Sequence, residues 1–154
     1  MKALRSSDRQ RVAGGCCRRA GQALGLALWA AQALASPAFV TDMPTPLTSV
    51  AGDPVQGLRI AQGREGQCAL CHALPGSTVR QGNMAPGLEG VAKRLSPAML
   101  RLRLVDSRQI NPDSLMPAYH STVGLQQVGK AWAGQPVLAA QDIEDVLAYL
   151  LTLN

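Results

Sequence analysis

The sequence has few aromatic residues, few cysteines and very few histidines. Its 154 residues include two Trp, two Tyr and one Phe, together with four Cys and two His. A domain of this size has a limited apolar core to begin with. The shortage of large rings indicates that something other than aromatic side chains fills its centre, and a flat apolar cofactor would do so.

The sequence also lacks a surplus of basic charge outside its first 35 residues. The whole chain has 15 Lys and Arg against 10 Asp and Glu, but six of the basic residues and one of the acidic residues lie in residues 1–35. Residues 36–154 therefore hold nine of each sign and are formally neutral. The high isoelectric point thus gives no reason to expect binding to nucleic acid or to a membrane surface.

No apolar run is long enough to form a stable membrane-spanning helix. The longest, AGQALGLALWAAQALA, follows a series of basic residues and is soon interrupted by Pro37. It ends in Ala33-Leu34-Ala35, which is a typical cleavage pattern for secretion. We therefore expect residues 1–35 to be a cleaved secretory signal peptide, with an uncleaved membrane anchor as the alternative. Cys16 and Cys17 should leave with this peptide.

The rest of the sequence divides into an arm and a domain. Residues 36–53 contain three prolines and show no periodicity, so we expect an extended N-terminal arm. From Pro54, a plausible first-turn residue, apolar residues recur at helical spacing until Gly63–Gly66, where the helix should end. We expect residues 54–154 to form one folded domain.

Two more helices are expected in this domain. Ser96-Pro97 is a good helix start, although the stretch LRLRLV that follows alternates with the period of a strand. We favour a helix there because nothing nearby offers a strand a partner. At the C-terminus, Ile143, Val146 and Leu147 recur at helical spacing, whereas residues 73–95 should be loop. The sequence therefore predicts a small all-α domain with short helices and long loops.

The motif with the clearest chemistry is Cys68-Ala69-Leu70-Cys71-His72. Cys-x-x-Cys-His is the attachment signature of c-type haem, in which two thiols form thioethers and the adjacent imidazole binds iron. A zinc site would need four ligands, and His120 is the only other usual soft ligand outside residues 1–35. A redox disulfide would need a βαβ context that this sequence lacks. We expect one covalently bound haem c, held by Cys68 and Cys71 with His72 as proximal iron ligand.

The second axial iron ligand must come from another part of the sequence. The candidates are Met43, Met84, Met99, Met116 and His120. We favour Met116, because it lies in a turn-rich loop directly before Pro117, which restrains the neighbouring backbone. A His/Met pair raises the reduction potential and fills both axial positions. Such a site favours electron transfer over ligand activation.

The order of these motifs resembles small class I cytochromes c. In that family a Gly-Pro-x-Leu-x-Gly loop follows the haem motif, and here Ala85 replaces its first glycine. The resemblance implies that the carbonyl of Pro86 accepts a hydrogen bond from the proximal His72. Because that role uses a backbone oxygen, the change to alanine does not threaten it. Tyr149 would be the packing aromatic of the last helix.

A narrower resemblance lies in RLVDSRQINPDSLMPAY, around Met116, which is similar to SoxX, the monohaem subunit of the SoxAX cytochromes of bacterial sulfur oxidation. It covers roughly residues 54–154. The resemblance implies a periplasmic heterodimer with SoxA that oxidatively conjugates thiosulfate to a cysteine of the carrier SoxYZ. SoxA would hold the substrate site, and this chain would pass electrons to a small cytochrome c. The alternatives are a free-standing monohaem shuttle and a haem-free thiol or metal module.

Several residues keep two interpretations at this stage. Some of the residues Arg101, Arg103 and Arg108 would contact a haem propionate or SoxA, or the three would form a solvated helix face. Trp132 lies at the haem edge, or it packs under the loop before the last helix. His120 is more easily explained as a surface or haem-edge residue than as an iron ligand.

Overall fold

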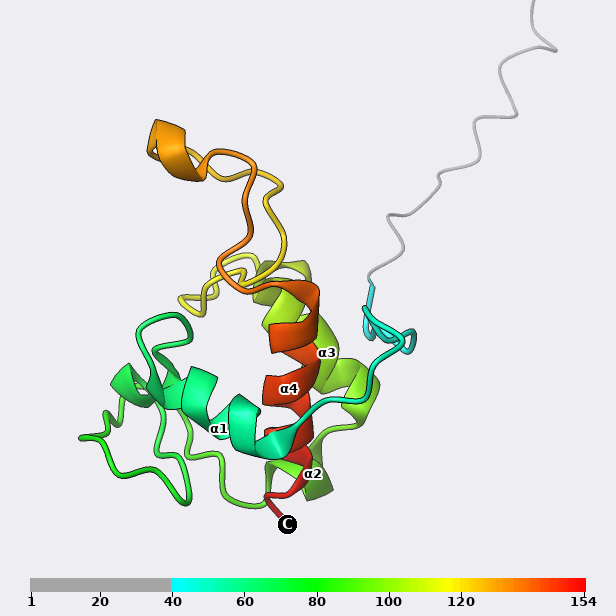
Figure 1. Cartoon of the computed structure of the whole chain (residues 1–154), viewed down its shortest axis with the longest axis vertical. Coiled ribbons are helices and arrows are strands. Elements are labelled where there is room, and N and C mark those ends of the chain that lie inside the picture. Colours follow the sequence, from blue (N-terminus) through cyan, green and yellow to red (C-terminus); the bar gives the residue numbers. More distant parts are fainter. Residues whose placement is uncertain (1–39) are drawn as a thin grey trace, which may run out of the picture. The chain divides into compact units, whose positions relative to one another are not determined.

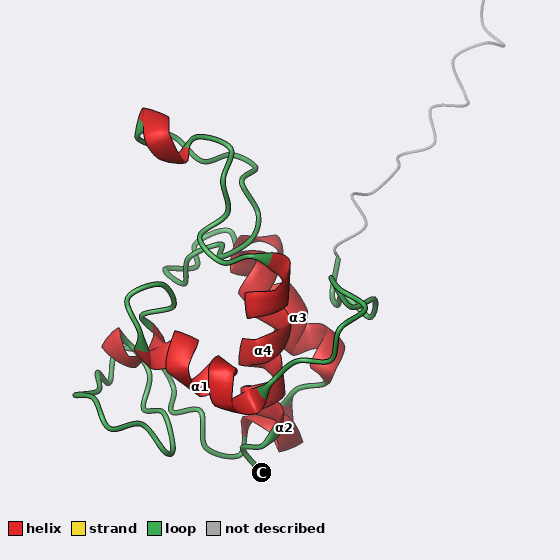
Figure 2. Cartoon of the chain, viewed as in Figure 1, coloured by secondary structure: helices red, strands yellow, loops and turns green. Residues whose placement is uncertain are grey.

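The computed structural model describes residues 40–154 (Figure 1). The expected signal peptide, residues 1–35, lies outside the described residues, as do the first four residues of the expected arm. The described part contains helices and loops and no strand (Figure 2). The elements are α1 (Pro54–Gln62), η1 (Cys68–Leu70), α2 (Val91–Arg94), α3 (Pro97–Asp106), η2 (Ser107–Gln109), η3 (Lys130–Trp132) and α4 (Ala140–Leu151). The expected all-α architecture is confirmed.

The start and the end of α1 agree with the sequence. The carboxylate of Asp53 accepts a hydrogen bond of 2.8 Å from the amide of Val55, and Pro54 occupies the first turn. At the other end, Gly63 is the C-cap and its amide bonds to the carbonyl of Ile60. The helix therefore ends at the glycine where it was expected to end.

The period-two stretch after Ser96 is helical, as we expected. The hydroxyl of Ser96 accepts a hydrogen bond of 3.2 Å from the amide of Met99, with Pro97 in the first turn. The expectation of uninterrupted loop over residues 73–95 is wrong at its end, because Val91–Arg94 forms the single turn α2. One turn has too few residues to show a helical period, so its sequence gives no signal.

Helices α1 and α4 cross in close contact at the centre of the domain (Figure 1). A β-carbon added to Gly57 would lie 1.9 Å from the carbonyl oxygen of Asp145. This position therefore needs glycine for the backbones to approach. Helix α3 packs against the side of α4. Most residues of the buried core come from these two helices, and Tyr119 and Leu138 add to it from the chain between them.

The N-terminal segment, residues 40–53, lies on α3 and α4. The amide of Leu47 donates to the carboxylate of Glu144 at 2.9 Å, and the guanidinium of Arg101 donates to the carbonyl of Met43 at 2.8 Å. The amide of Asp53 donates to Asp145 at 2.9 Å. This segment has no helix or strand of its own, but it is fixed to the domain by hydrogen bonds to its own chain.

Residues 121–137, which we call the outer loop, project away from the helices (Figure 1). Its first residue is half-buried, and every residue from 122 to 137 is exposed. It contains only the short turn η3. Within residues 40–154, no helix is both long and apolar enough to cross a membrane.

Candidate functional site

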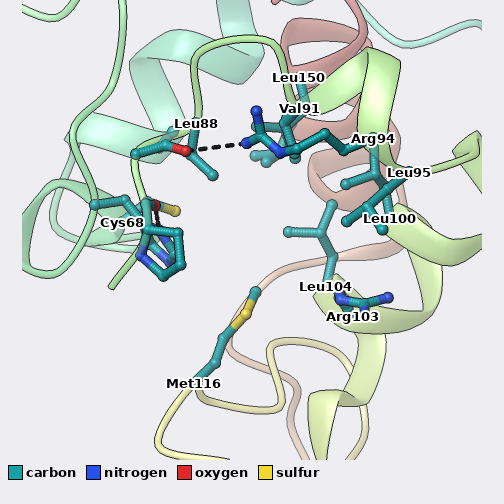
Figure 3. A pocket seen from close by; sticks show the side chains of 15 residues that line it. Cys68, Leu88, Val91, Arg94, Leu95, Leu100, Arg103, Leu104, Met116 and Leu150 are labelled. Carbon is teal, nitrogen blue, oxygen red and sulfur yellow. Dashed lines mark hydrogen bonds between the residues drawn. The ribbon is translucent and has the colours of Figure 1, made fainter. Parts of the chain in front are cut away.

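All four α-helices contribute to one apolar cavity of about 380 Å³. This volume lies in the ordinary range for a small-molecule or cofactor site. Its walls are formed by side chains of Ala61 in α1, Val91 in α2, Leu100 and Leu104 in α3, and Val146 and Leu150 in α4. Figure 3 shows Leu100 and Leu104 on one side of this space and Cys68 on the other.

The Cys-x-x-Cys-His motif begins with the turn η1 and lies at the edge of this cavity. Cys68 and His72 line the cavity, while Cys71 faces a smaller adjoining hollow of about 100 Å³. The two cysteines are free thiols and do not form a disulfide. The amide of His72 donates to the carbonyl of Cys68 at 2.9 Å. This bond closes the turn and brings both thiols and the imidazole to one region.

The imidazole of His72 is oriented by the backbone of the loop after it. Its Nδ1 lies 2.7 Å from the carbonyl oxygen of Pro86, which can only accept a hydrogen bond. Nδ1 must therefore hold the proton and donate it, which leaves the lone pair of Nε2 free to bind a metal. The hydrogen bond that the class I resemblance implies is present.

Met116 reaches the same cavity from the loop after α3. Figure 3 shows its side chain pointing into the space between Cys68 and Leu104. The buried hydroxyl of Ser107 donates to the carbonyl of Met116 at 2.8 Å, and the hydroxyl of Ser114 accepts from its amide at 3.2 Å. Two serines thus restrain the methionine backbone, in addition to Pro117. Sequence reasoning did not identify either serine.

The remaining candidates for an axial ligand do not line the large cavity. Met84 is 67% exposed and lies at the smaller hollow. Met99 is half-buried on α3, and Met43 packs against the core. The Nδ1 of His120 lies 2.9 Å from the carbonyl of Leu138. Among these candidates, Met116 is the one placed with His72 at the large cavity.

Tyr119 joins the two loops that carry the site. Its phenol donates a hydrogen bond of 2.6 Å to the carbonyl of Gly66, two residues before Cys68, and its side chain is buried. Burial and the neighbouring thiol of Cys68 raise the pKa of the phenol, so it remains a donor at any physiological pH. The sequence shows Tyr119 only as one of few aromatics, and nothing in it identifies this contact.

The three arginines of interest have three different surroundings. Arg101 is buried and forms an ion pair of 2.8 Å with Glu144, so neither of its two expected roles is correct. Arg108 pairs with Asp106 at 2.8 Å and lies away from the cavity. Of the three, Arg103 is the one that lines the cavity. Arg94, which the sequence analysis did not identify, lines it as well. These two arginines place positive charge at the rim of an otherwise apolar space.

Trp132 fits neither of its expected positions. It lies in η3 of the outer loop and is 68% exposed, so it does not pack under the loop before α4. It is absent from the lining of both hollows beside Cys68. Within residues 40–154, no three His, Cys, Asp or Glu side chains gather into a metal site.

The residues around the cavity fit a haem c. A large apolar space suits a flat macrocycle; the thiol of Cys68 and the imidazole of His72 lie at its edge, and the free thiol of Cys71 lies at the adjoining hollow. The donor set of one oriented imidazole and one thioether is a recognised pair of axial haem ligands. Arg94 and Arg103 provide cations for the carboxylates that a haem bears.

The comparisons with known proteins agree with this geometry. No known family model matches the chain, and no curated sequence matches it. Among solved structures, the chain is similar to the crystal structure of SoxXA from P. pantotrophus, with a TM-score of 0.67 and 31% sequence identity. The similarity covers 73% of this chain and 90% of that one.

The short helices, the long loops and the cavity between them define a small class I cytochrome c-like protein. At this identity and coverage the family is also defined. The chain belongs to the SoxX-like cytochromes.

Proposed function

We propose that this chain is the electron-transfer subunit of a SoxAX complex, with one haem c attached through Cys68 and Cys71. The single observation that supports this most is the joint presence of Cys68, His72 and Met116 at one apolar cavity, in a chain similar to SoxXA. When bound, the haem supplies a one-electron ferric/ferrous couple. The chain's own residues hold and orient it.

Each residue of the site has a distinct part in this proposal. His72 would bind the iron through Nε2, and the carbonyl of Pro86 fixes the orientation of the ring. Met116 would provide the second protein ligand, with its backbone held by the hydrogen bonds of Ser107 and Ser114. If both of these side chains bind the iron, the metal would offer substrate no open position. The site is therefore suited to electron transfer and not to substrate activation.

The substrate chemistry belongs to the partner subunit in this proposal. Joining thiosulfate to a carrier cysteine forms one sulfur–sulfur bond and releases one proton and two electrons. Residues 36–154 contain no cysteine besides Cys68 and Cys71, so no thiol remains to act as a sulfur nucleophile. The chain would accept the electrons one at a time and pass them to a small cytochrome c, while SoxA and the carrier SoxYZ perform the conjugation.

The location follows from the same proposal. Attachment of haem c takes place after export, and the leader sequence of residues 1–35 supplies an export signal. We place the mature protein, residues 36–154, in the periplasm as a heterodimer with SoxA.

Coexpression tests this function directly. An affinity tag on a SoxA-type partner should retain the untagged chain in a stable one-to-one complex that contains haem from both subunits. Thiosulfate and the carrier should then reduce the haem of this chain. A chain that remains a monomer in the presence of the partner would favour the free-standing shuttle instead.

A further inference from the structure

The outer loop, residues 121–137, exposes apolar side chains that nothing in the described residues covers. Trp132 is 68% exposed and Val123 is 78% exposed, and three more apolar residues of the loop are exposed as well: Leu125, Val128 and Val137. An exposed tryptophan together with several aliphatic residues on one projection is unusual on a monomer surface, and such groups mark interaction sites.

The loop is also nearly free of charge. Lys130 is its only charged residue, among three glutamines, three glycines and the apolar side chains. Interface centres are depleted of charged residues, and tryptophan is one of the residues enriched at energetically dominant positions. The composition of the loop therefore fits an apolar groove on a partner and does not fit a charged surface.

The base of the loop is fixed to the site. The amide of Leu138 donates to the carbonyl of Tyr119 at 2.8 Å, and Nδ1 of His120 donates to the carbonyl of Leu138 at 2.9 Å. Tyr119 follows Met116 by three residues and bonds to Gly66 beside the haem motif. A protein that binds the loop is thereby held close to the loop of Met116 and to the cavity that the cofactor would occupy.

The chain itself offers the outer loop two other kinds of contact: with its own N-terminal segment, or with a second copy of the chain. The N-terminal segment is already held on α3 and α4 by hydrogen bonds. In a second copy, the large apolar cavity is the cofactor site, and a further hollow is bordered by Arg59, Glu65, Asp142 and Asp145, so neither suits an apolar loop. An open apolar hollow lined by Val55, Leu58 and Tyr149 is the surface of a second copy on which the loop could lie, and sedimentation of the chain alone tests that contact.

We infer that the outer loop is the docking element of this chain for the SoxA-type partner, with Trp132 as its anchor in an apolar groove of that subunit. This inference rests on the proposed function, because it assigns a surface to the same complex. Since the loop has one charge, the affinity should depend little on salt. We expect the Kd to change by less than about threefold between low and high ionic strength.

The test compares two double variants of the haem-loaded chain. V128S/W132S changes two exposed residues of the outer loop, and V50S/V55S changes two exposed residues outside it. None of the four side chains is buried, so both variants should keep the wild-type haem spectrum and unfolding midpoint. We expect V128S/W132S to raise the Kd for the partner by about thirtyfold or more, as for truncation of a dominant interface residue. V50S/V55S should bind as the wild type does.

The outcomes separate this inference from the proposed function. If the wild type binds the partner and V128S/W132S binds equally well, the inference is wrong and the proposed function stands. If the wild type does not bind at all, both are wrong. Sedimentation of the chain alone gives a further check: a dimer that V128S/W132S dissociates would assign the loop to self-association and overturn its assignment to the partner.

A second readout reports on Trp132 itself. It is the only tryptophan of residues 36–154, so a mature chain with 5-fluorotryptophan gives one fluorine resonance. Addition of the unlabelled partner should shift this resonance and remove its sensitivity to the H₂O/D₂O ratio. An unchanged resonance in a formed complex would contradict the inference.

Discussion

The phenol of Tyr119 donates a hydrogen bond of 2.6 Å to the carbonyl of Gly66, across 53 positions of the sequence. This bond connects the loop that holds Met116 to the loop that holds Cys68. It therefore ties together the two segments whose side chains would hold the proposed haem. A defined separation of these segments is needed if a thioether is to stay within reach of iron.

Removing this hydrogen bond should weaken the iron–methionine bond. In Tyr119→Phe, the buried carbonyl of Gly66 loses its partner, and we expect a loss of about 1–3 kcal/mol in the free energy of unfolding. We also expect a weaker far-red absorption of the oxidised protein and faster binding of carbon monoxide to the reduced protein.

Tyr149→Phe is the matched control, because the phenol of Tyr149 donates to the carbonyl of Pro75, also at 2.6 Å, and Tyr149 lines neither hollow beside Cys68. It should lower stability without changing either spectroscopic signal. Equal effects of the two variants on the far-red band would show that Tyr119 has no special relation to Met116.

The ion pair of Arg101 and Glu144 should contribute strongly to stability, because both side chains are less than a tenth exposed. Arg101→Met leaves Glu144 buried without its partner, and we expect a loss of about 3–5 kcal/mol in the free energy of unfolding. The double variant R101M/E144L should recover much of this loss, since it buries no unpaired charge. Urea unfolding measures both values.

Arg108→Met is the comparison for that experiment. Asp106 is as buried as Glu144, but Arg108 itself is 31% exposed against 7% for Arg101, so water can take the place of the Arg108 guanidinium beside the Asp106 carboxylate. We expect a clearly smaller loss than for Arg101→Met. A loss of the same size would mean that burial does not determine the effect.

The pH dependence of stability should reflect Glu144. Burial raises the pKa of this carboxyl, but the hydrogen bonds from Arg101 and from the amide of Leu47 outweigh burial, so its pKa lies below the ordinary value of 4.5. A carboxyl with a lowered pKa in the folded state stabilises the protein above its unfolded pKa, and this stabilisation is lost as the pH falls through the folded pKa.

We therefore expect the urea midpoint of the wild type to fall as the pH is lowered below about 4.5. In Glu144→Gln the fall should be shallower, because one of the groups responsible has been removed. Parallel curves for the two proteins would contradict the assigned pKa shift.

The crossing of α1 and α4 should tolerate no side chain at Gly57. Because a β-carbon there would lie 1.9 Å from the carbonyl of Asp145, Gly57→Ala must push the two helices apart. We expect a loss of about 3 kcal/mol or more in the free energy of unfolding, at or beyond the upper end of overpacking effects. Gly129→Ala is the control, since its β-carbon would meet only the edge of Trp132 at 3.8 Å. A folded Gly57→Ala with wild-type stability would refute this account of the crossing.

Much of the fold was predictable from local signals. Pro54, Gly63 and Ser96-Pro97 mark helix ends through backbone chemistry, which needs no knowledge of the rest of the chain. The Cys-x-x-Cys-His motif likewise predicts haem attachment from five adjacent residues alone. These features are visible in the sequence because cause and effect lie a few residues apart.

What the sequence did not show depends on distant contacts. Arg101 looks like a solvent-facing charge until Glu144, 43 positions later, is placed beside it. Trp132 looks like a core residue because large rings are usually buried, and only the projection of the outer loop places it in solvent. In both cases the position of a residue is set by segments that no local pattern predicts.

The central claim is that His72 and Met116 hold one covalent haem c in this chain, and the visible spectrum tests it most directly. The exported wild type should show sharp α and β bands when reduced and a far-red band when oxidised. In Met116→Ala the α and β bands should remain while the far-red band disappears. If the wild type lacks the α and β bands, or if the far-red band survives in Met116→Ala, the account is contradicted.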